Sequence, residues 1–190
     1  MALHDLADIR LIPSQMVLDS SLLLALRKGD DNPRAAVAHR FVGWLGQQVI
    51  NQQIAAWLLP SVLQECYHVI LSRAIRRAWE ALPLATRPAN WLAAYKRQPE
   101  LLATGFSDLG DFDKILAAIP VTPAQPKDLD MGRASQAVEV RMRHFITTYY
   151  LLPQDALILA EAERLGVSAV ATLDSDWRRV AEFDIYTTPV

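Results

Sequence analysis

Four short acidic segments carry the residues of this chain that are best suited to chemistry. They are Val17–Ser20, Ser61–Glu65, Pro153–Ala160 and Thr172–Trp177. Each segment places a carboxylate at or near the boundary of a strongly apolar stretch. Carboxylates that converge on one place repel one another, and a hard divalent cation, which prefers oxygen ligands, relieves that repulsion. The pattern therefore predicts a metal-dependent enzyme.

Composition and charge narrow the class of protein. The chain has 190 residues, of which 52% are apolar, which is typical of one globular domain. A net charge of −2 excludes a strong overall attraction to nucleic acid, although a local basic face can still bind phosphate. The single cysteine, Cys66, cannot form an intramolecular disulfide, which fits a reducing compartment. Residues 1–15 lack the apolar core of a signal peptide, and no apolar run approaches the roughly 18–20 residues that cross a bilayer. We therefore expect a cytoplasmic protein without membrane contact.

Short apolar runs alternate with helical patterns along the chain. The expected strands are Met16–Leu18, Ala55–Leu59, Val167–Leu173 and a last edge strand at Ile185-Tyr186. The expected helices are 34–47, a helix from Ser61, a short one after Asn90, 111–119, 129–145 and 153–165. Ser20 or Ser21 is expected to cap a short helix, and Ser61 with Gln64 forms a capping-box pattern. This alternation predicts an α/β fold with a mainly parallel sheet.

The acids fall where such a fold places its sites. In open parallel sheets, sites form at the carboxyl ends of the strands. Asp19 and Asp174 each follow an expected strand, whereas Asp155 lies in the first turn of its helix, where the helix dipole favours a carboxylate. Glu65 lies near the start of another helix. Each acid alone is more simply explained as a cap or an exposed first-turn residue, but the four together predict one site.

The four segments resemble the motifs of PIN-domain nucleases, most closely the VapC-type toxin ribonucleases of type II toxin–antitoxin pairs. Those domains carry a first-strand Asp followed by Ser or Thr, here Asp19-Ser20, and a helix acid after the second strand, here Glu65. They also carry an Asp-Ala-Leu-Ile helix start, here Asp155–Ile158, and a closing turn, here Thr172–Trp177. The resemblance extends from about Met16 to Tyr186.

The resemblance implies a fold and its boundaries. It implies a three-layer α/β/α architecture and a single domain over residues 1–190. Residues 1–15 would then be an N-terminal extension, and about 79–113 a helical insertion longer than the compact helical hairpin of small family members. This insertion, rich in Leu and Trp, is a candidate interface or substrate clamp.

The resemblance also implies an activity and partners. The chain would be an endoribonuclease that hydrolyses RNA with Mg²⁺ or Mn²⁺, the toxin of a pair with a cognate antitoxin, and a homodimer. Asp19, Asp155 and Asp174 would bind the metal directly, and Asp176 would be a secondary ligand. Glu65 would be a ligand or would orient the attacking water.

The hydroxyl and basic residues near the acids can either contact the substrate or have a structural role. The hydroxyls of Ser20 and Thr172 lie beside the expected site and can bind a carboxylate or a phosphate, or can serve as a helix cap and a strand residue. The cations that follow the acids can hold RNA phosphates or form solvated helix faces. They are Arg73, Arg76, Arg77, Arg178 and Arg179, with a second basic stretch at Arg133, Arg141, Arg143 and His144. The five tryptophans are more often core or interface residues than base-stacking platforms.

The same motifs allow two other functions, and the sequence argues against two other classes of enzyme. The chain can be a PIN-like scaffold that binds RNA or a partner without cleavage, or a housekeeping PIN nuclease with no antitoxin. The Asp174–Asp176 turn also resembles the nucleophile motif of haloacid-dehalogenase-like phosphatases, but only fourteen residues follow it, too few for the large downstream domain that motif needs. The chain lacks a Gly-rich phosphate loop with Lys, which excludes an NTPase of that type.

Overall fold

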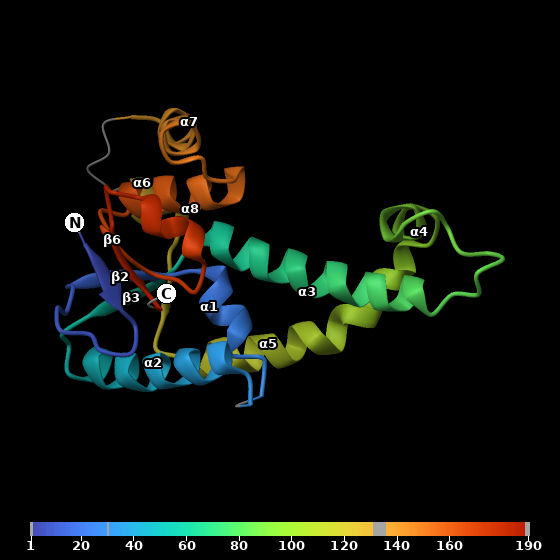
Figure 1. The fold of residues 1–190 in the computed structure, drawn as a ribbon, viewed down its shortest axis with the longest axis horizontal. Coiled ribbons are helices and arrows are strands. Elements are labelled where there is room, and N and C mark those ends of the chain that lie inside the picture. The colour runs from blue at the N-terminus through green and yellow to red at the C-terminus, as the bar shows by residue number, and fades with distance from the viewer. Residues whose placement is uncertain (1, 30, 131–135, 189–190) are drawn as a thin grey trace. The chain divides into compact units, whose positions relative to one another are not determined.

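The computed structural model describes residues 2–29, 31–130 and 136–188, and the chain divides into two compact units (Figure 1). Unit 1 comprises Met1–Leu63 and Ile119–Val190, and unit 2 comprises Gln64–Ala118. Helix α3 (Pro60–Glu80) begins in unit 1 and continues into unit 2. Within the described ranges, no helix is long and apolar enough to cross a membrane.

Unit 1 is built on a six-stranded sheet in which all neighbouring strands are parallel, in the order β1-β6-β5-β2-β3-β4. The strands are β1 (Leu3–Asp5), β2 (Gln15–Leu18), β3 (Ala55–Leu58), β4 (Thr122–Pro123), β5 (Ala169–Ala171) and β6 (Asp184–Thr187). From β2 the chain proceeds outward to β3 and β4, whereas β5 and β6 lie on the other side of β2. The strand order therefore reverses between β2 and β5, and in open α/β sheets such a reversal is where ligands bind.

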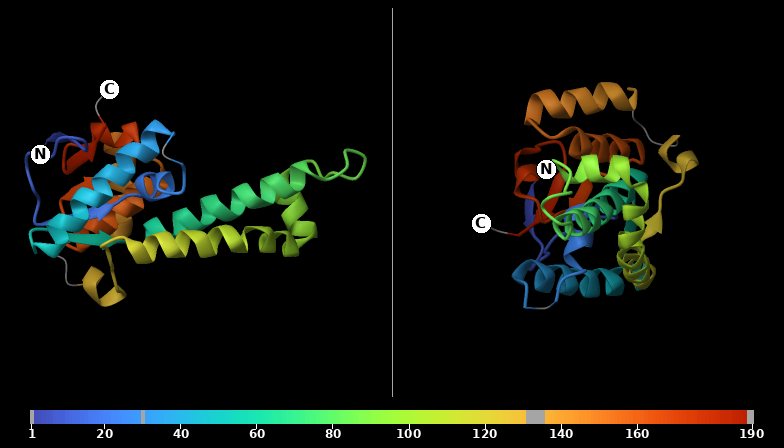
Figure 2. Two further views of the ribbon diagram at one scale, coloured as in Figure 1. Left: turned by 90° about the horizontal axis from the view of Figure 1, so that it is seen from below. Right: turned by 90° about the vertical axis from the view of Figure 1, so that its right-hand side faces the viewer.

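Helices cover both faces of this sheet (Figures 1 and 2). On one face lies α8 (Pro153–Arg164), which packs against α7 (Val138–Tyr149) and the short α6 (Pro126–Asp130). On the other lies α2 (Pro33–Ile50), which packs against α1 (Ser20–Ala25). The predicted three-layer α/β/α fold with a parallel central sheet is confirmed.

The central strands are buried on both faces, as their uninterrupted apolar sequences require. Met16, Val17 and Leu18 of β2 are fully buried, as are Val170 and Ala171 of β5. A parallel sheet covered by helices on both sides buries both faces of its inner strands, so β5 and the part of β2 from Met16 onward are apolar rather than alternating. The core therefore fixes β2 and β5 side by side, up to the residues that follow them.

The edge of the sheet differs from the prediction. The strand expected at Ile185-Tyr186 is not an edge strand, because β6 lies between β5 and β1. On this side of the sheet the edge strand is β1, which comes from the N-terminal extension and pairs Leu3 with Ile185. Its three side chains are exposed or half-buried. Such a short strand carries no apolar run of its own, so only its pairing with β6 defines it.

Two helix starts also differ from the prediction. The side chain of Asp19, and not that of Ser20 or Ser21, caps α1 by accepting a hydrogen bond from the Ser21 backbone N–H. The capping box at Ser61 is wrong as well, because α3 begins at Pro60 and Ser61 lies inside the helix. The Ser61 hydroxyl instead donates to Glu161 Oε2 at 2.6 Å, since a carboxylate is a stronger acceptor than a water molecule or a neutral group.

The regular secondary structure described in unit 2 consists of helices. After α3 it contains α4 (Trp91–Arg97), the 3₁₀ helix η1 (Pro99–Gly105) and α5 (Phe106–Ala118). Asn90 caps α4, as its position predicts, by accepting from the Ala93 N–H at 2.8 Å. Gly105 allows η1 to approach α3 closely, since a Cβ there would lie 2.9 Å from Leu71 Cδ2. The whole of the predicted insertion at 79–113 falls within this unit.

Candidate active site

Asp19 occupies the point where the strand order reverses. It follows β2 directly, and its backbone N–H donates to the Ala171 carbonyl of β5 at 2.9 Å. Only 2% of its surface is exposed. The apolar residues that precede it are fully buried, and the fold holds this carboxylate inside the protein at the carboxyl edge of the sheet.

Hydroxyl groups from both sides of the reversal orient this carboxylate. Asp19 Oδ2 accepts from Ser21 Oγ at 2.6 Å, from Thr172 Oγ1 at 2.7 Å and from the Ser21 backbone N–H at 3.2 Å. Oδ1 is met by Ser20 Oγ at 3.5 Å, the limit of a hydrogen bond. The side chain is therefore fixed through Oδ2, while Oδ1 remains the oxygen better able to accept a further ligand.

The burial of Asp19 has an electrostatic consequence. Desolvation raises the pKa of the Asp19 carboxyl above its ordinary value, and the hydrogen bonds from Ser21 and Thr172 offset this only in part. An anionic carboxylate in this position is costly, and a cation beside it would lower the cost.

The closing turn begins where β5 ends. The Asp174 backbone N–H donates to Thr172 Oγ1 at 2.9 Å, so one hydroxyl joins the Asp19 and Asp174 segments. Asp174 caps η2 (Ser175–Arg179) and accepts the Asp176 N–H at 2.9 Å. Trp177 is fully buried. The turn therefore presents its acids at the same edge of the sheet as Asp19.

The basic residues of this turn bind within unit 1. Arg178 donates to the Thr188 carbonyl, and Arg179 donates to the Tyr150 carbonyl at 3.0 Å. Arg179 also lies 3.4 Å from Asp176 Oδ2. Both arginines thus have structural partners, which favours the interpretation that they stabilise the turn.

Asp155 lies in the first turn of α8 and is half-buried. The residue before it, Gln154, donates through Nε2 to the Ser61 carbonyl at 2.9 Å. From the other direction Ser61 donates to Glu161 of the same helix. The start of α3 is therefore attached to α8 on both sides of Asp155, which fixes the helix turn that carries this acid.

Glu65 and the three arginines predicted to bind RNA belong to unit 2. Glu65 lies in α3 and is half-buried. Arg77 pairs with Asp108 at 2.5 Å, whereas Arg76 lies over the ring of Trp91, 5.2 Å from its centre. Arg73 is exposed and has no ion-pair partner among the described residues. Arg73 and Arg76 are therefore more available than Arg77 to bind an anionic ligand.

Two members of the second basic stretch, Arg141 and His144, have structural partners, whereas Arg143 is exposed. Arg141 binds Glu163 and Glu182, with each nitrogen–oxygen distance 2.6 Å, and His144 Nε2 lies 2.5 Å from Glu182 Oε1. Tyr149 also donates to Glu182 at 3.0 Å. These bonds attach α7 to α8 and to the segment before β6. Arg133 lies outside the described residues.

The family of the chain follows from a match over most of its length. Residues 16–183 match the family model described as PIN domain, which covers Asp19, Asp155 and the closing turn. The chain belongs to the PIN domain family. PIN domains are generally metal-dependent nucleases that act on nucleic acid, so the family gives this protein a nuclease-type function. A search among curated proteins found no match.

The oxygen donors at the carboxyl edge of the sheet in this PIN domain are of the chemical type that binds a divalent cation. Asp19 supplies a desolvated carboxylate, and the closing turn supplies Asp174, so the donors are hard oxygens of the type that Mg²⁺ and Mn²⁺ prefer. Over residues 2–29, 31–130 and 136–188, no three or more His, Cys, Asp or Glu side chains are grouped as a metal site. Asp19, Thr172 and Asp174 are brought together, and shared coordination by all the acids stays a prediction.

Sequence reasoning missed one hydroxyl of the PIN site. It selected Ser20, but Ser21 makes the short bond to Asp19. A capping Asp accepts from the backbone two residues ahead, and that geometry also brings the Ser21 side chain beside the carboxylate. The sequence Asp19-Ser20-Ser21 could have predicted this bond, but only if Asp19 itself had been identified as the helix cap.

Proposed function

We propose that this PIN-domain protein is an endoribonuclease that hydrolyses RNA phosphodiester bonds with Mg²⁺ or Mn²⁺. The observation that supports it most is Asp19, a carboxylate with 2% exposure that is held by two hydroxyl groups at the reversal of strand order. A structural role does not require an acid there, because a neutral residue would avoid the cost of desolvation. An acid that binds a cation is consistent with that position, because the cation offsets the cost of desolvation.

The residues divide into ligands and positioning groups. Asp19, Asp155 and Asp174 would hold the metal, with Asp176 as a further ligand. A divalent cation, when bound, lowers the pKa of water and stabilises the charge of an attacked phosphate. The role of Glu65, as a ligand or as the group that orients water, rests on the sequence alone.

Ser21 and Thr172 would act through Asp19 rather than on the substrate. Their hydroxyls already point to Oδ2, so the carboxylate does not have to reorganise when a ligand arrives. Because Thr172 also accepts from the Asp174 N–H, it positions both acidic segments at once. Among the cations of unit 2, Arg73 and Arg76 are the stronger candidates for phosphate binding, and Arg77 the weaker one because of its pair with Asp108.

The test is the metal dependence and the substrate class of cleavage. Purified full-length protein would be incubated with a mixed pool of single-stranded and structured RNA, in Mg²⁺, in Mn²⁺ or in EDTA, beside DNA of the same sequences. We expect internal cuts in RNA that require the metal and stop in EDTA. Cleavage of DNA alone, or RNA binding without cleavage under every condition, would contradict the proposal and favour another nuclease or a binding scaffold.

We also propose that the enzyme is the toxin of a toxin–antitoxin pair and a homodimer. This rests on the resemblance of its four motifs, in their order, to the VapC-type toxins. An antitoxin could inhibit such a site by placing a cationic side chain beside the acids, which would replace the charge of the metal. Induced expression should then arrest growth, and expression of the Asp19→Asn variant should not. Unimpaired growth would contradict the role as a toxin. A monomer by light scattering across concentrations would contradict the homodimer.

A further inference from the structure

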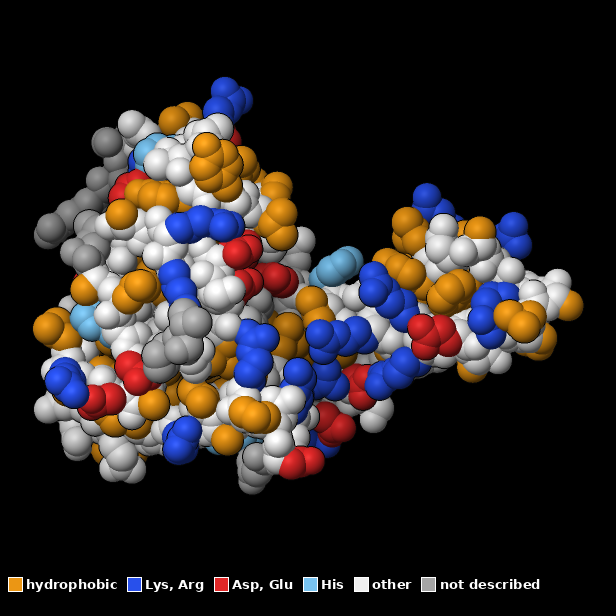
Figure 3. All heavy atoms as spheres, viewed as in Figure 1, with side chains coloured by type: hydrophobic (Ala, Val, Ile, Leu, Met, Phe, Trp, Pro, Cys, Tyr) orange, Lys and Arg blue, Asp and Glu red, His pale blue; other side chains and the backbone are white. Residues whose placement is uncertain are grey.

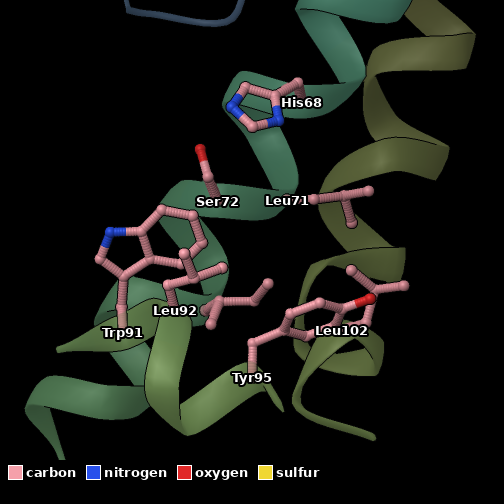
Figure 4. Close-up of a pocket in the computed structure, with 8 residues that line it drawn as sticks. His68, Leu71, Ser72, Trp91, Leu92, Tyr95 and Leu102 are labelled. Carbon is pink, nitrogen blue, oxygen red and sulfur yellow. The ribbon is translucent and has the colours of Figure 1, made fainter. Parts of the chain in front are cut away.

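Unit 2 contains a pocket that the proposed chemistry does not use (Figure 4). Its volume is about 220 Å³, which is smaller than the pockets of drug-sized ligands, for which about 300–1,000 Å³ is usual. Helix α3 contributes His68 and Ser72, one turn apart, and α4 contributes Trp91, Leu92 and Tyr95. Figure 4 shows the α4 side chains facing those of α3 across the opening. The pocket is therefore formed within one unit, by elements that pack on each other.

The walls of the pocket are aromatic and apolar, and its polar groups can form further hydrogen bonds. Trp91 and Tyr95 are half-buried, and Leu92 keeps 44% of its surface exposed. Ser72 donates to the Val69 carbonyl at 3.2 Å, which leaves its oxygen free to accept. Among the described residues, the Trp91 N–H, the Tyr95 hydroxyl and the His68 ring have no hydrogen-bond partner. A ligand that fills this space would be flat, partly apolar and able to form hydrogen bonds.

Positive charge gathers beside this pocket. Residues 73–97 contain six Lys or Arg residues and a single acid, Glu80. Figure 3 shows several Lys or Arg side chains, in blue, on the visible face of unit 2. Arg76 is exposed and lies over the Trp91 ring, 5.2 Å from its centre. The ligand that fits these surroundings carries negative charge next to its flat ring.

We propose that this pocket binds one unpaired nucleobase of a single-stranded RNA, with Arg76 at the neighbouring phosphate. Unpaired bases in single strands stack on aromatic and arginine side chains and use their edges for hydrogen bonds, which are the groups that this pocket presents. A protein helix would need a long apolar groove, whereas this cavity has room for one ring system. The inference rests on the proposed function, because it concerns the substrate of the same enzyme.

The test is equilibrium binding of a labelled single-stranded RNA to the full-length chain in EDTA, so that binding is measured without cleavage. Trp91→Ala removes the stacking surface, and Ser72→Leu fills the pocket without removing a wall. Leu84→Ala is the matched control, because Leu84 is an apolar residue of unit 2 that is 82% exposed and does not line the pocket. Circular dichroism of each variant checks that unit 2 keeps its helices.

We expect Trp91→Ala and Ser72→Leu each to weaken RNA binding about tenfold, the usual size of one base–aromatic stack, and Leu84→Ala to leave it unchanged. An RNA with one abasic ribose at the bound position should bind wild type about tenfold more weakly and Ser72→Leu with no further loss.

Equal RNA affinity of Ser72→Leu and wild type would overturn the inference. So would an abasic ribose that weakens both proteins to the same extent. If the pocket fails in this way while wild type still cleaves RNA with metal, the proposed function stands without it. Absence of both RNA binding and RNA cleavage would overturn both proposals.

Discussion

The hydroxyl of Thr172 donates to Asp19 Oδ2 at 2.7 Å and accepts from the Asp174 backbone N–H at 2.9 Å. Two acids that are far apart in the sequence thus depend on one fully buried side chain. This is possible because β2 and β5 are neighbours in register, with Leu18 opposite Ala171, and because each strand is followed at once by polar residues. The relationship makes Thr172 a positioning residue with a measurable role.

Thr172→Val keeps the shape of the side chain but removes its hydroxyl. Asp19 would lose a donor and the Asp174 N–H an acceptor, both in a buried place, so we expect the free energy of unfolding to fall by about 1–3 kcal/mol. Thr172→Ser keeps the hydroxyl and loses one methyl group, at about 1 kcal/mol. Urea unfolding in EDTA measures both variants. RNA cleavage should persist in Thr172→Ser and drop in Thr172→Val, and a Val variant as stable and active as the Ser variant would contradict this role.

Asp19→Asn should separate stability from function. Burial raises the pKa of Asp19, so the carboxylate costs stability at neutral pH, and the cost vanishes as the pH falls below the ordinary value of 3.8. In EDTA at neutral pH, we expect the Asn variant to melt no lower than wild type. Mg²⁺ or Mn²⁺ should raise the melting temperature of wild type and leave that of the variant unchanged. A metal-induced rise of equal size in both proteins would show that Asp19 is not a ligand.

The bond between Ser61 and Glu161 should contribute to the stability of unit 1. Only 2% of the surface of Ser61 is exposed. Its hydroxyl donates to the Glu161 carboxylate, and hydrogen bonds to a charged acceptor are stronger than those to a neutral one. Ser61→Ala should lower the free energy of unfolding by about 1.5–3 kcal/mol. Ser107→Ala, at an exposed position of α5, is the matched control and should change it by less than about 0.5 kcal/mol. Urea unfolding of the two variants decides this, and equal midpoints would argue against the bond.

Glu182 should give the protein part of its acid sensitivity. Partial burial raises the pKa of Glu182, but bonds from His144, Arg141 and Tyr149 together outweigh it and hold the pKa below the ordinary 4.5. A lowered pKa contributes stability above 4.5 that is lost as the pH falls through the folded-state value. Glu182→Gln should therefore melt a few degrees below wild type at pH 7, with the difference closing toward pH 3. Thermal melts from pH 7 to pH 3 check this, and a constant difference would contradict it.

The sequence was a good guide wherever apolar runs end in acids. The apolar runs Met16–Leu18 before Asp19 and Ala169–Ala171 before the closing turn revealed both strands and their ends, and Pro153 and Gly166 marked the helix between them. Because parallel strands meet at one edge, the placement of Asp19 beside the closing turn followed from the order of the elements alone.

The sequence was a poor guide where tertiary pairing decides the outcome. Strand β1 has no apolar pattern, and it exists only because β6 offers it an edge. Ser61 had the spacing of a cap, but the carboxylate of Glu161, one hundred residues away, determined its bond. The pocket between α3 and α4 could not be foreseen either, since Trp91 alone does not reveal whether it lies in a core or at an opening.

The most direct measurement compares the initial rates of RNA cleavage by wild type and by single Asp→Asn variants of Asp19, Asp155 and Asp174, in Mn²⁺ and Mg²⁺. The matched controls are Asp8→Asn, an exposed surface acid, and Glu139→Gln, an exposed acid in the first turn of α7. We predict that each of the three site variants loses cleavage at least a hundredfold while remaining folded, and that both controls cleave like wild type. Full cleavage by any folded site variant would contradict the assignment of that acid, and full cleavage by all three would contradict the account.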